Sequence, residues 1–140
     1  MATSARKRPD LLVDTSARWR SRSPTTSNTT RRSRRRRLGL AGHAAFETFS
    51  VLTRLPAPAR RTPATVARLL AANFPHSRFL GADSSRSLSG RLATIGVAGG
   101  SVYDALVGAA AAEHGLRLAS RDRRALQTYR ALDVEVEFLS

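Results

Sequence analysis

The sequence predicts an α/β fold, with a mainly parallel sheet flanked by helices. Two observations predict it: short apolar runs of strand length recur along the chain, and stretches with helical periodicity separate them. The length of 140 residues supports a single domain, 1–140, large enough to bury a core.

Short runs of apolar residues predict the strands. They lie at 11–16, 38–40 and 116–119, and the last of them, 134–139, alternates apolar and polar side chains. A further short strand is expected at 78–80.

Apolar residues at helical spacing, together with capping residues, predict the helices. Pro56 ends the first of them, Thr62 followed by Pro63 begins the second, and Gly115 ends the Ala-rich helix 101–114. On that helix we expect Val102, Leu106 and Ala109 or Ala110 to face inward. The predicted helices span 43–55, 63–73, 84–95, 101–114 and 123–132.

The composition excludes several classes of protein. The chain has no cysteine, so disulfides, thiolate metal sites and cysteine nucleophiles are excluded, and oxygen ligands for a hard cation remain. No apolar run reaches the roughly 18–20 residues of a membrane span, and residues 1–10 lack the apolar stretch of a signal peptide. We therefore expect a cytoplasmic protein without a membrane segment.

Positive charge is concentrated near the N-terminus. Of the formal net charge of +14, residues 1–37 carry +10, in a basic tail at 1–9 and an Arg/Ser/Thr-rich segment at 17–37. The segment shows neither helical nor strand periodicity. Two interpretations stay open: an arm that attracts nucleic-acid phosphates, or solvated disorder.

Four carboxylates are placed where elements begin or end. Asp14 and Asp122 follow predicted strands, whose carboxyl ends are the usual place for ligand sites in parallel sheets, while Glu47 and Asp104 lie in early turns of helices. Gathered carboxylates repel one another unless a cation such as Mg²⁺ or Mn²⁺ neutralises them, and such an ion can activate water against a phosphodiester. Taken singly, Asp122 could cap the next helix, Glu47 could lie on a solvated face, and Asp104 could interact with a helix dipole.

Four segments together resemble the PIN-domain ribonuclease toxins of the VapC type. The match covers residues 10–16 and 38–140, in order and with separations typical of the family. The segments are LLVDTS at 11–16, GHAAFETFSVLTRLP at 42–56, GGSVYDALV at 99–107 and LASRDRRAL at 118–126.

This resemblance implies a PIN-like three-layer fold and a Mg²⁺- or Mn²⁺-dependent endoribonuclease, the toxin of a type II toxin–antitoxin system. It also implies an RNA substrate, a cognate antitoxin that covers the cleft, and a homodimer built from helices. Asp14 and Asp104 would be the main metal ligands and catalytic residues, and Glu47 and Asp122 would complete the site directly or through water. Thr15 or Ser16 would support it.

The arginines on either side of Asp122 are further candidates for the site. Arg121 and Arg123 are expected to flank the cleft, either as contacts to RNA phosphates or as part of a solvated surface.

Residues 17–37 depart from the family, which is expected to have an amphipathic helix there. Codons for 17–31 can be chosen so that an adjacent frame encodes apolar residues followed by Asp, His, Glu and Gln, which leads to the hypothesis of two compensating frameshifts. Two alternatives to an active toxin therefore stay open: a non-catalytic Arg-rich nucleic-acid-binding protein, and a damaged, inactive toxin that still binds its antitoxin.

Overall fold

Four short strands form a parallel sheet in the order β2-β1-β3-β4. They are β1 (Leu11–Val13), β2 (Leu38–Leu40), β3 (Leu118–Ser120) and β4 (Val136–Phe138). The structure is a computed structural model that describes residues 11–16 and 37–140. The basic tail 1–9 and nearly all of the segment 17–37 lie outside the described residues, so the expectations for them stay predictions.

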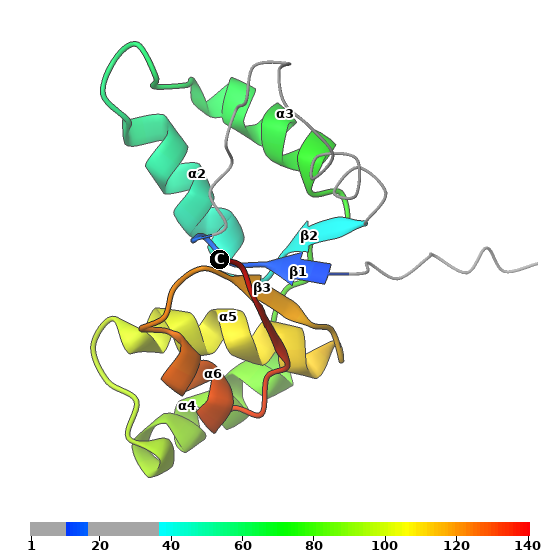
Figure 1. Cartoon of the computed structure of the whole chain (residues 1–140), viewed down its shortest axis with the longest axis vertical. Helices are drawn as coiled ribbons and strands as arrows, with labels where there is room; N and C mark the ends of the chain where they lie inside the picture. Colours follow the sequence, from blue (N-terminus) through cyan, green and yellow to red (C-terminus); the bar gives the residue numbers. More distant parts are fainter. Residues whose placement is uncertain (1–10, 17–36) are drawn as a thin grey trace, which may run out of the picture.

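The register brings the carboxyl ends of β1 and β3 together. Leu12 pairs with Leu118 and Val13 with Ala119, and the N–H of Asp14 then donates to the carbonyl of Ala119 at 3.2 Å. Residues that follow the two strands therefore share one edge of the sheet, as predicted for parallel strands. The C-terminus of the chain lies at the same edge (Figure 1).

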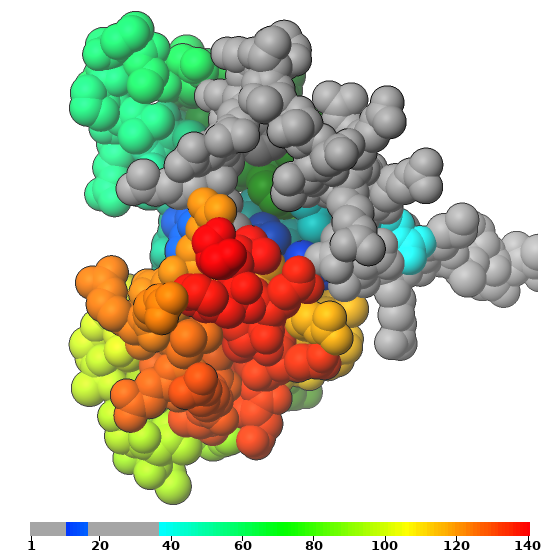
Figure 2. All heavy atoms as spheres, in the orientation of Figure 1, coloured from blue at the N-terminus to red at the C-terminus, as the bar shows by residue number. Residues whose placement is uncertain are grey.

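Helices cover the sheet from two sides and make three layers, as predicted (Figure 1). One side carries α2 (Ala44–Arg54) and α3 (Pro63–Asn73), while α4 (Ala82–Ile95), α5 (Ser101–Glu113) and α6 (Leu126–Ala131) lie on the other. Figure 2 shows the same division, with α2 in blue-green standing apart from residues 82–140 in yellow-green to red. Within residues 11–16 and 37–140, no helix is long and apolar enough to cross a bilayer.

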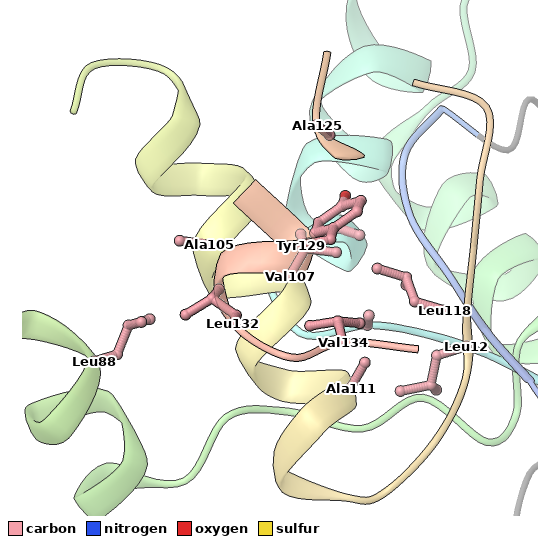
Figure 3. Close-up of a cluster of buried hydrophobic side chains, with 12 residues drawn as sticks. Leu12, Leu88, Ala105, Val107, Ala111, Leu118, Ala125, Tyr129, Leu132 and Val134 are labelled. Atoms are coloured by element: carbon pink, nitrogen blue, oxygen red, sulfur yellow. The ribbon is translucent and has the colours of Figure 1, made fainter. Parts of the chain in front are cut away.

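The alternation of side chains along β1 divides the core in two. Leu12 points into the larger cluster with Leu118 and the buried Tyr129 of α6, where Figure 3 shows it among residues of α5 and α6. Leu11 and Val13 point the other way, into a smaller cluster completed by side chains of α2 and α3. The strand is therefore buried on both faces.

Local capping contacts explain several helix boundaries. The Thr62 hydroxyl accepts from the N–H of Thr65 at the start of α3, and Gly96 and Gly115 take positive φ values of 70° and 62° just after α4 and α5. α4 begins two residues earlier than predicted, at Ala82, because the Glu113 carboxylate accepts the N–H of Gly81 at 2.8 Å.

Two local predictions were wrong, and a third was right only in part. The expected strand 78–80 is reduced to one bridge between Ala41 and Arg78. The helix predicted at 123–132 forms only over Leu126–Ala131, because residues 123–125 make a turn. On α5 the buried residues are Ala105, Val107, Gly108, Ala110 and Ala111, so the expected face holds at Ala110, while Leu106 and Ala109 pack against the core only partly buried and Ala105, Val107 and Ala111 were not predicted. An Ala-rich helix lacks the polar contrast from which a buried face can be predicted.

Candidate active site

Asp14 is a buried carboxylate held by three donors. Its side chain is 5% exposed, at the carboxyl end of β1. The hydroxyl of Tyr129 donates to Oδ2 at 2.9 Å, and the backbone N–H of Ser16 donates to Oδ1 at 3.0 Å, with the Ser16 hydroxyl on the same oxygen. Because a buried charge is tolerated only when it is hydrogen-bonded, these contacts allow Asp14 to remain beneath the surface in a set orientation.

Tyr129 keeps its proton for this contact. Burial, followed by the charge of Asp14, raises the pKa of the Tyr129 hydroxyl. Its side chain crosses the larger core cluster from α6, so a core residue positions a carboxylate of the site (Figure 3).

Glu47 lies in the first turn of α2 and reaches the chain just after β1. The hydroxyl of Thr15 donates to Glu47 Oε2 at 2.9 Å, and His43 Nε2 lies 3.6 Å from Oε1. Thr15 and Ser16, expected as supporting polar residues, thus contact Glu47 and Asp14 respectively.

Asp122 is part of the turn that follows β3. Its Oδ1 accepts the backbone N–H of Arg124 at 2.9 Å, and its own N–H donates to the hydroxyl of Ser120 at 3.0 Å. That hydroxyl lies 3.3 Å from the hydroxyl of Ser16. Asp122 therefore caps the turn 123–125 and not α6, which begins after Ala125 without a side-chain cap, and Asp122 is also joined to the end of β1 through paired serines.

Asp104 shows that all four carboxylates share one region. Burial and then the charges of Asp122, Glu47 and Asp14 raise its pKa from 3.8 to about 6, against a smaller opposite effect of Arg124. These four side chains come from β1, α2, α5 and the turn after β3, elements that the sequence separates by up to 108 positions. The fold therefore brings the predicted quartet within electrostatic range.

The quartet is not arranged as a closed coordination shell. Among residues 11–16 and 37–140, no three His, Asp or Glu side chains lie close enough to hold one ion together. The donor set nonetheless fits a hard divalent cation, because it offers only carboxylate oxygens and because their mutual repulsion, seen at Asp104, would be offset by a positive ion.

The predicted RNA-contacting arginines lie at the same edge of the sheet. Arg121 and Arg123 are both exposed. The Arg121 guanidinium donates to the Ser140 carbonyl at 3.4 Å, and the Arg123 guanidinium lies 5.0 Å from the ring centroid of Phe138. Both side chains thus rest against the C-terminal strand, beside the carboxylates.

Several residues of the site were missed in the sequence. Tyr129, Ser120 and His43 were not predicted from the sequence. Tyr129 lies 115 positions from Asp14, and a tyrosine at helical spacing is first of all a core residue, so no signal in the sequence linked the two. Ser120 directly follows the strand predicted at 116–119, at the edge of the sheet that carries the site, which is a signal that could have found it.

An all-parallel sheet between two layers of helices, with acidic side chains gathered beyond its carboxyl edge, defines a PIN-like α/β protein. The chain is 48% identical over 101 residues to Ribonuclease VapC27 of Mycobacterium tuberculosis (strain ATCC 25618 / H37Rv), a match covering 72% of this chain and 74% of that protein. It is likewise 48% identical over 103 residues to Ribonuclease VapC40 of Mycobacterium tuberculosis (strain CDC 1551 / Oshkosh), covering 72% and 76%. No family model and no solved structure matches the chain. The chain belongs to the VapC-type ribonucleases, and the resemblance predicted from its motifs is confirmed.

Proposed function

We propose that this chain is a metal-dependent endoribonuclease that hydrolyses RNA phosphodiester bonds as the toxin of a type II toxin–antitoxin system. Its similarity to the ribonucleases VapC27 and VapC40 supports ribonuclease activity. The single observation that carries the proposal to this chain is the gathering of three carboxylates around Asp104, whose charges add to the effect of burial and raise its pKa. An acidic cluster at this edge of a parallel sheet suits a cation far better than it suits a structural role.

In this proposal Asp14 and Asp104 are the main ligands of Mg²⁺ or Mn²⁺, and Glu47 and Asp122 complete the site directly or through water. The bound ion would supply an activated water and neutralise charge on the phosphate. The protein contributes orientation: Tyr129 and residues just after β1 hold the carboxylates in place.

The remaining assignments concern partners. Arg121 and Arg123 would contact RNA phosphates beside the cleft, which their exposure at this edge supports. A cognate antitoxin would cover the cleft, and two copies would associate through helices, as the family membership suggests. With RNA as its substrate, the protein would act in the cytoplasm.

Replacing Asp104 with Asn tests the catalytic proposal. We expect RNA cleavage in Mg²⁺ to fall about 100-fold or more, because a charged ligand is lost, while RNA binding measured without metal is retained. Asp83→Asn is the matched control, since its fully exposed side chain lies on α4, outside the site. Metal-independent cleavage, or unchanged cleavage by Asp104→Asn, would contradict the assignment.

The two alternatives predict different results. A non-catalytic nucleic-acid-binding protein would show no Mg²⁺-dependent cleavage by the wild type, yet would bind RNA. A damaged toxin would fold poorly when expressed alone, and the DNA across codons 15–38 would show paired frame changes relative to a close relative. The contacts that hold Asp14 come from Ser16 and Tyr129, both in the described part of the chain, which favours an intact site.

A further inference from the structure

Four rings form a ridge beside the carboxylates. In order along the surface they are Tyr103, His43, Phe46 and Phe79, called here the aromatic ridge. His43 stacks on Tyr103 with centroids 5.1 Å apart and planes at 16°, and Phe46 lies 6.4 Å from His43 and 6.0 Å from Phe79. Three separate segments supply the rings: the start of α2, the start of α5 and the loop before α4.

The ridge is exposed to solvent. Phe46 is 64% exposed, Tyr103 52% and Phe79 51%. Single exposed apolar residues are normal on a protein surface, but a contiguous group of large exposed rings marks a binding surface. The ring of Phe138 is less exposed and already contacts the guanidinium of Arg123, so it is not part of the aromatic ridge.

The ridge adjoins the proposed site through sequence neighbours and a direct contact. Phe46 directly precedes Glu47, Tyr103 directly precedes Asp104, and His43 lies 3.6 Å from Glu47. A polymer whose scissile phosphate lies at the carboxylates would therefore extend its neighbouring units over these rings.

Charge distinguishes the possible occupants. The chain carries a formal net charge of +14, which favours a polyanion as the occupant of the ridge. Base faces are available for stacking on aromatic rings only where bases are unpaired, because a duplex buries them.

We propose that the aromatic ridge is a stacking platform for unpaired RNA bases next to the scissile phosphate. The inference rests on the proposed function, because it takes RNA to be the substrate of the adjacent carboxylates. The rings select unpaired bases by their π faces, whereas the arginines hold the backbone by charge.

The test measures RNA binding separately from cleavage and from charge. A fluorescent single-stranded oligoribonucleotide is titrated with the full chain in EDTA, at several salt concentrations, and the dissociation constant is obtained from anisotropy. The same titration uses an oligonucleotide of equal length with abasic positions. The variant is Phe46→Leu/Phe79→Leu, which keeps apolar side chains but removes both rings, and the conservative variant is Phe46→Tyr/Phe79→Tyr.

We expect the leucine variant to bind the intact oligonucleotide about tenfold more weakly, since stacking on aromatic side chains contributes substantially per base. The salt dependence of its RNA affinity should be unchanged, and its affinity for abasic RNA should equal that of the wild type. The tyrosine variant should bind both oligonucleotides as the wild type does. Arg121→Ala is the contrasting variant. It should reduce the slope of the logarithm of RNA affinity against the logarithm of salt concentration by about one, because one phosphate contact is lost. Circular dichroism confirms that each variant is folded.

Equal binding of intact RNA by the wild type and the leucine variant would overturn the proposal, as would an equal loss on abasic RNA. If sedimentation instead shows a wild-type dimer that the leucine variant breaks without changing RNA binding, the ridge belongs to a second copy. The proposed function fails separately: cleavage retained by Asp104→Asn would reject the carboxylate site while leaving base-dependent binding by the ridge intact.

Discussion

Asp14 and Asp104 illustrate two ways in which a fold can hold a carboxylate. Asp14 is nearly fully buried and is satisfied by Tyr129 and Ser16. Asp104 is partly exposed, and burial together with three acidic neighbours raises its pKa to about 6. The first carboxylate is positioned by donors, while the second is destabilised by its surroundings, which is common at functional sites.

Replacing Asp104 with Asn should stabilise the metal-free protein at pH 7. The folded pKa lies above the ordinary value of 3.8, so the native state binds more protons than the unfolded state between pH 3.8 and about 6, and stability falls as pH rises through that window. The shift corresponds to at most about 3 kcal/mol, and solvent screening at this partly exposed side chain reduces the expected gain to about 1 kcal/mol. Urea unfolding in EDTA measures it.

The stability gained by Asp104→Asn should disappear below pH 4, where the aspartate of the wild type is protonated in both the folded and the unfolded state. A variant that is less stable than the wild type at pH 7 would show that Asp104 is not under repulsion from its neighbours. The exposed Asp83→Asn again supplies the control for a change of net charge.

At the scale of elements, the contact between α5 and α6 connects the core to the site. Gly108 of α5 faces Tyr129 of α6, and a Cβ at this position would lie 2.9 Å from Tyr129 Cδ1 and 3.2 Å from Val134 Cγ2. The glycine therefore makes room for the ring whose hydroxyl holds Asp14. In this way a small residue in a helix is coupled to the orientation of a carboxylate on a strand.

Gly108→Ala should destabilise the protein by about 1–2 kcal/mol. Overpacking against Tyr129 costs about 1–3 kcal/mol, while the better helix propensity of alanine recovers at most about 1 kcal/mol. The matched control is Gly90→Ala on α4, where a Cβ meets nothing within 4 Å, so that stability should rise by about 0.5–1 kcal/mol. Chemical denaturation of both variants tests this, and equal effects would contradict the packing argument.

For the whole molecule, the parallel sheet makes a single edge where distant segments meet. Five parts of the chain approach this edge: the ends of β1 and β3, the starts of α2 and α5, and the C-terminus (Figure 1). The charge is distributed differently: residues 38–140 carry +4 of the total of +14. The acidic site therefore lies in a chain that is basic overall and attracts polyanions.

Divalent metal should stabilise the whole fold if the four carboxylates bind it. A ligand that binds only the native state adds about 2.7 kcal/mol at 100 times its dissociation constant, which raises the Tm of a small domain by several degrees. We expect Mg²⁺ or Mn²⁺ to raise the Tm of the wild type and of Arg121→Ala, but not that of Asp104→Asn. A rise of equal size in Asp104→Asn would place the metal elsewhere.

Prediction from the sequence succeeded where a local pattern decides the outcome. Thr62 and Pro63 predicted the start of α3, and Gly115 the end of α5, because capping depends on adjacent residues. It failed for the length of α6 and found only part of the buried face of α5, where tertiary packing decides which small residues are covered. Asp14, Glu47, Asp104 and Asp122 were predicted from their places at element ends, whereas Tyr129 was found only in the fold.

By itself the sequence determined the α/β class, the family and the four acidic residues, because these depend on periodicity, capping and short motifs along the chain. The tertiary structure decided that the four carboxylates share one region, that Tyr129 holds Asp14, and that the rings of the aromatic ridge adjoin one another. The physical reason is that pKa shifts, buried hydrogen bonds and ring contacts act between residues close in space, whatever their separation in the chain.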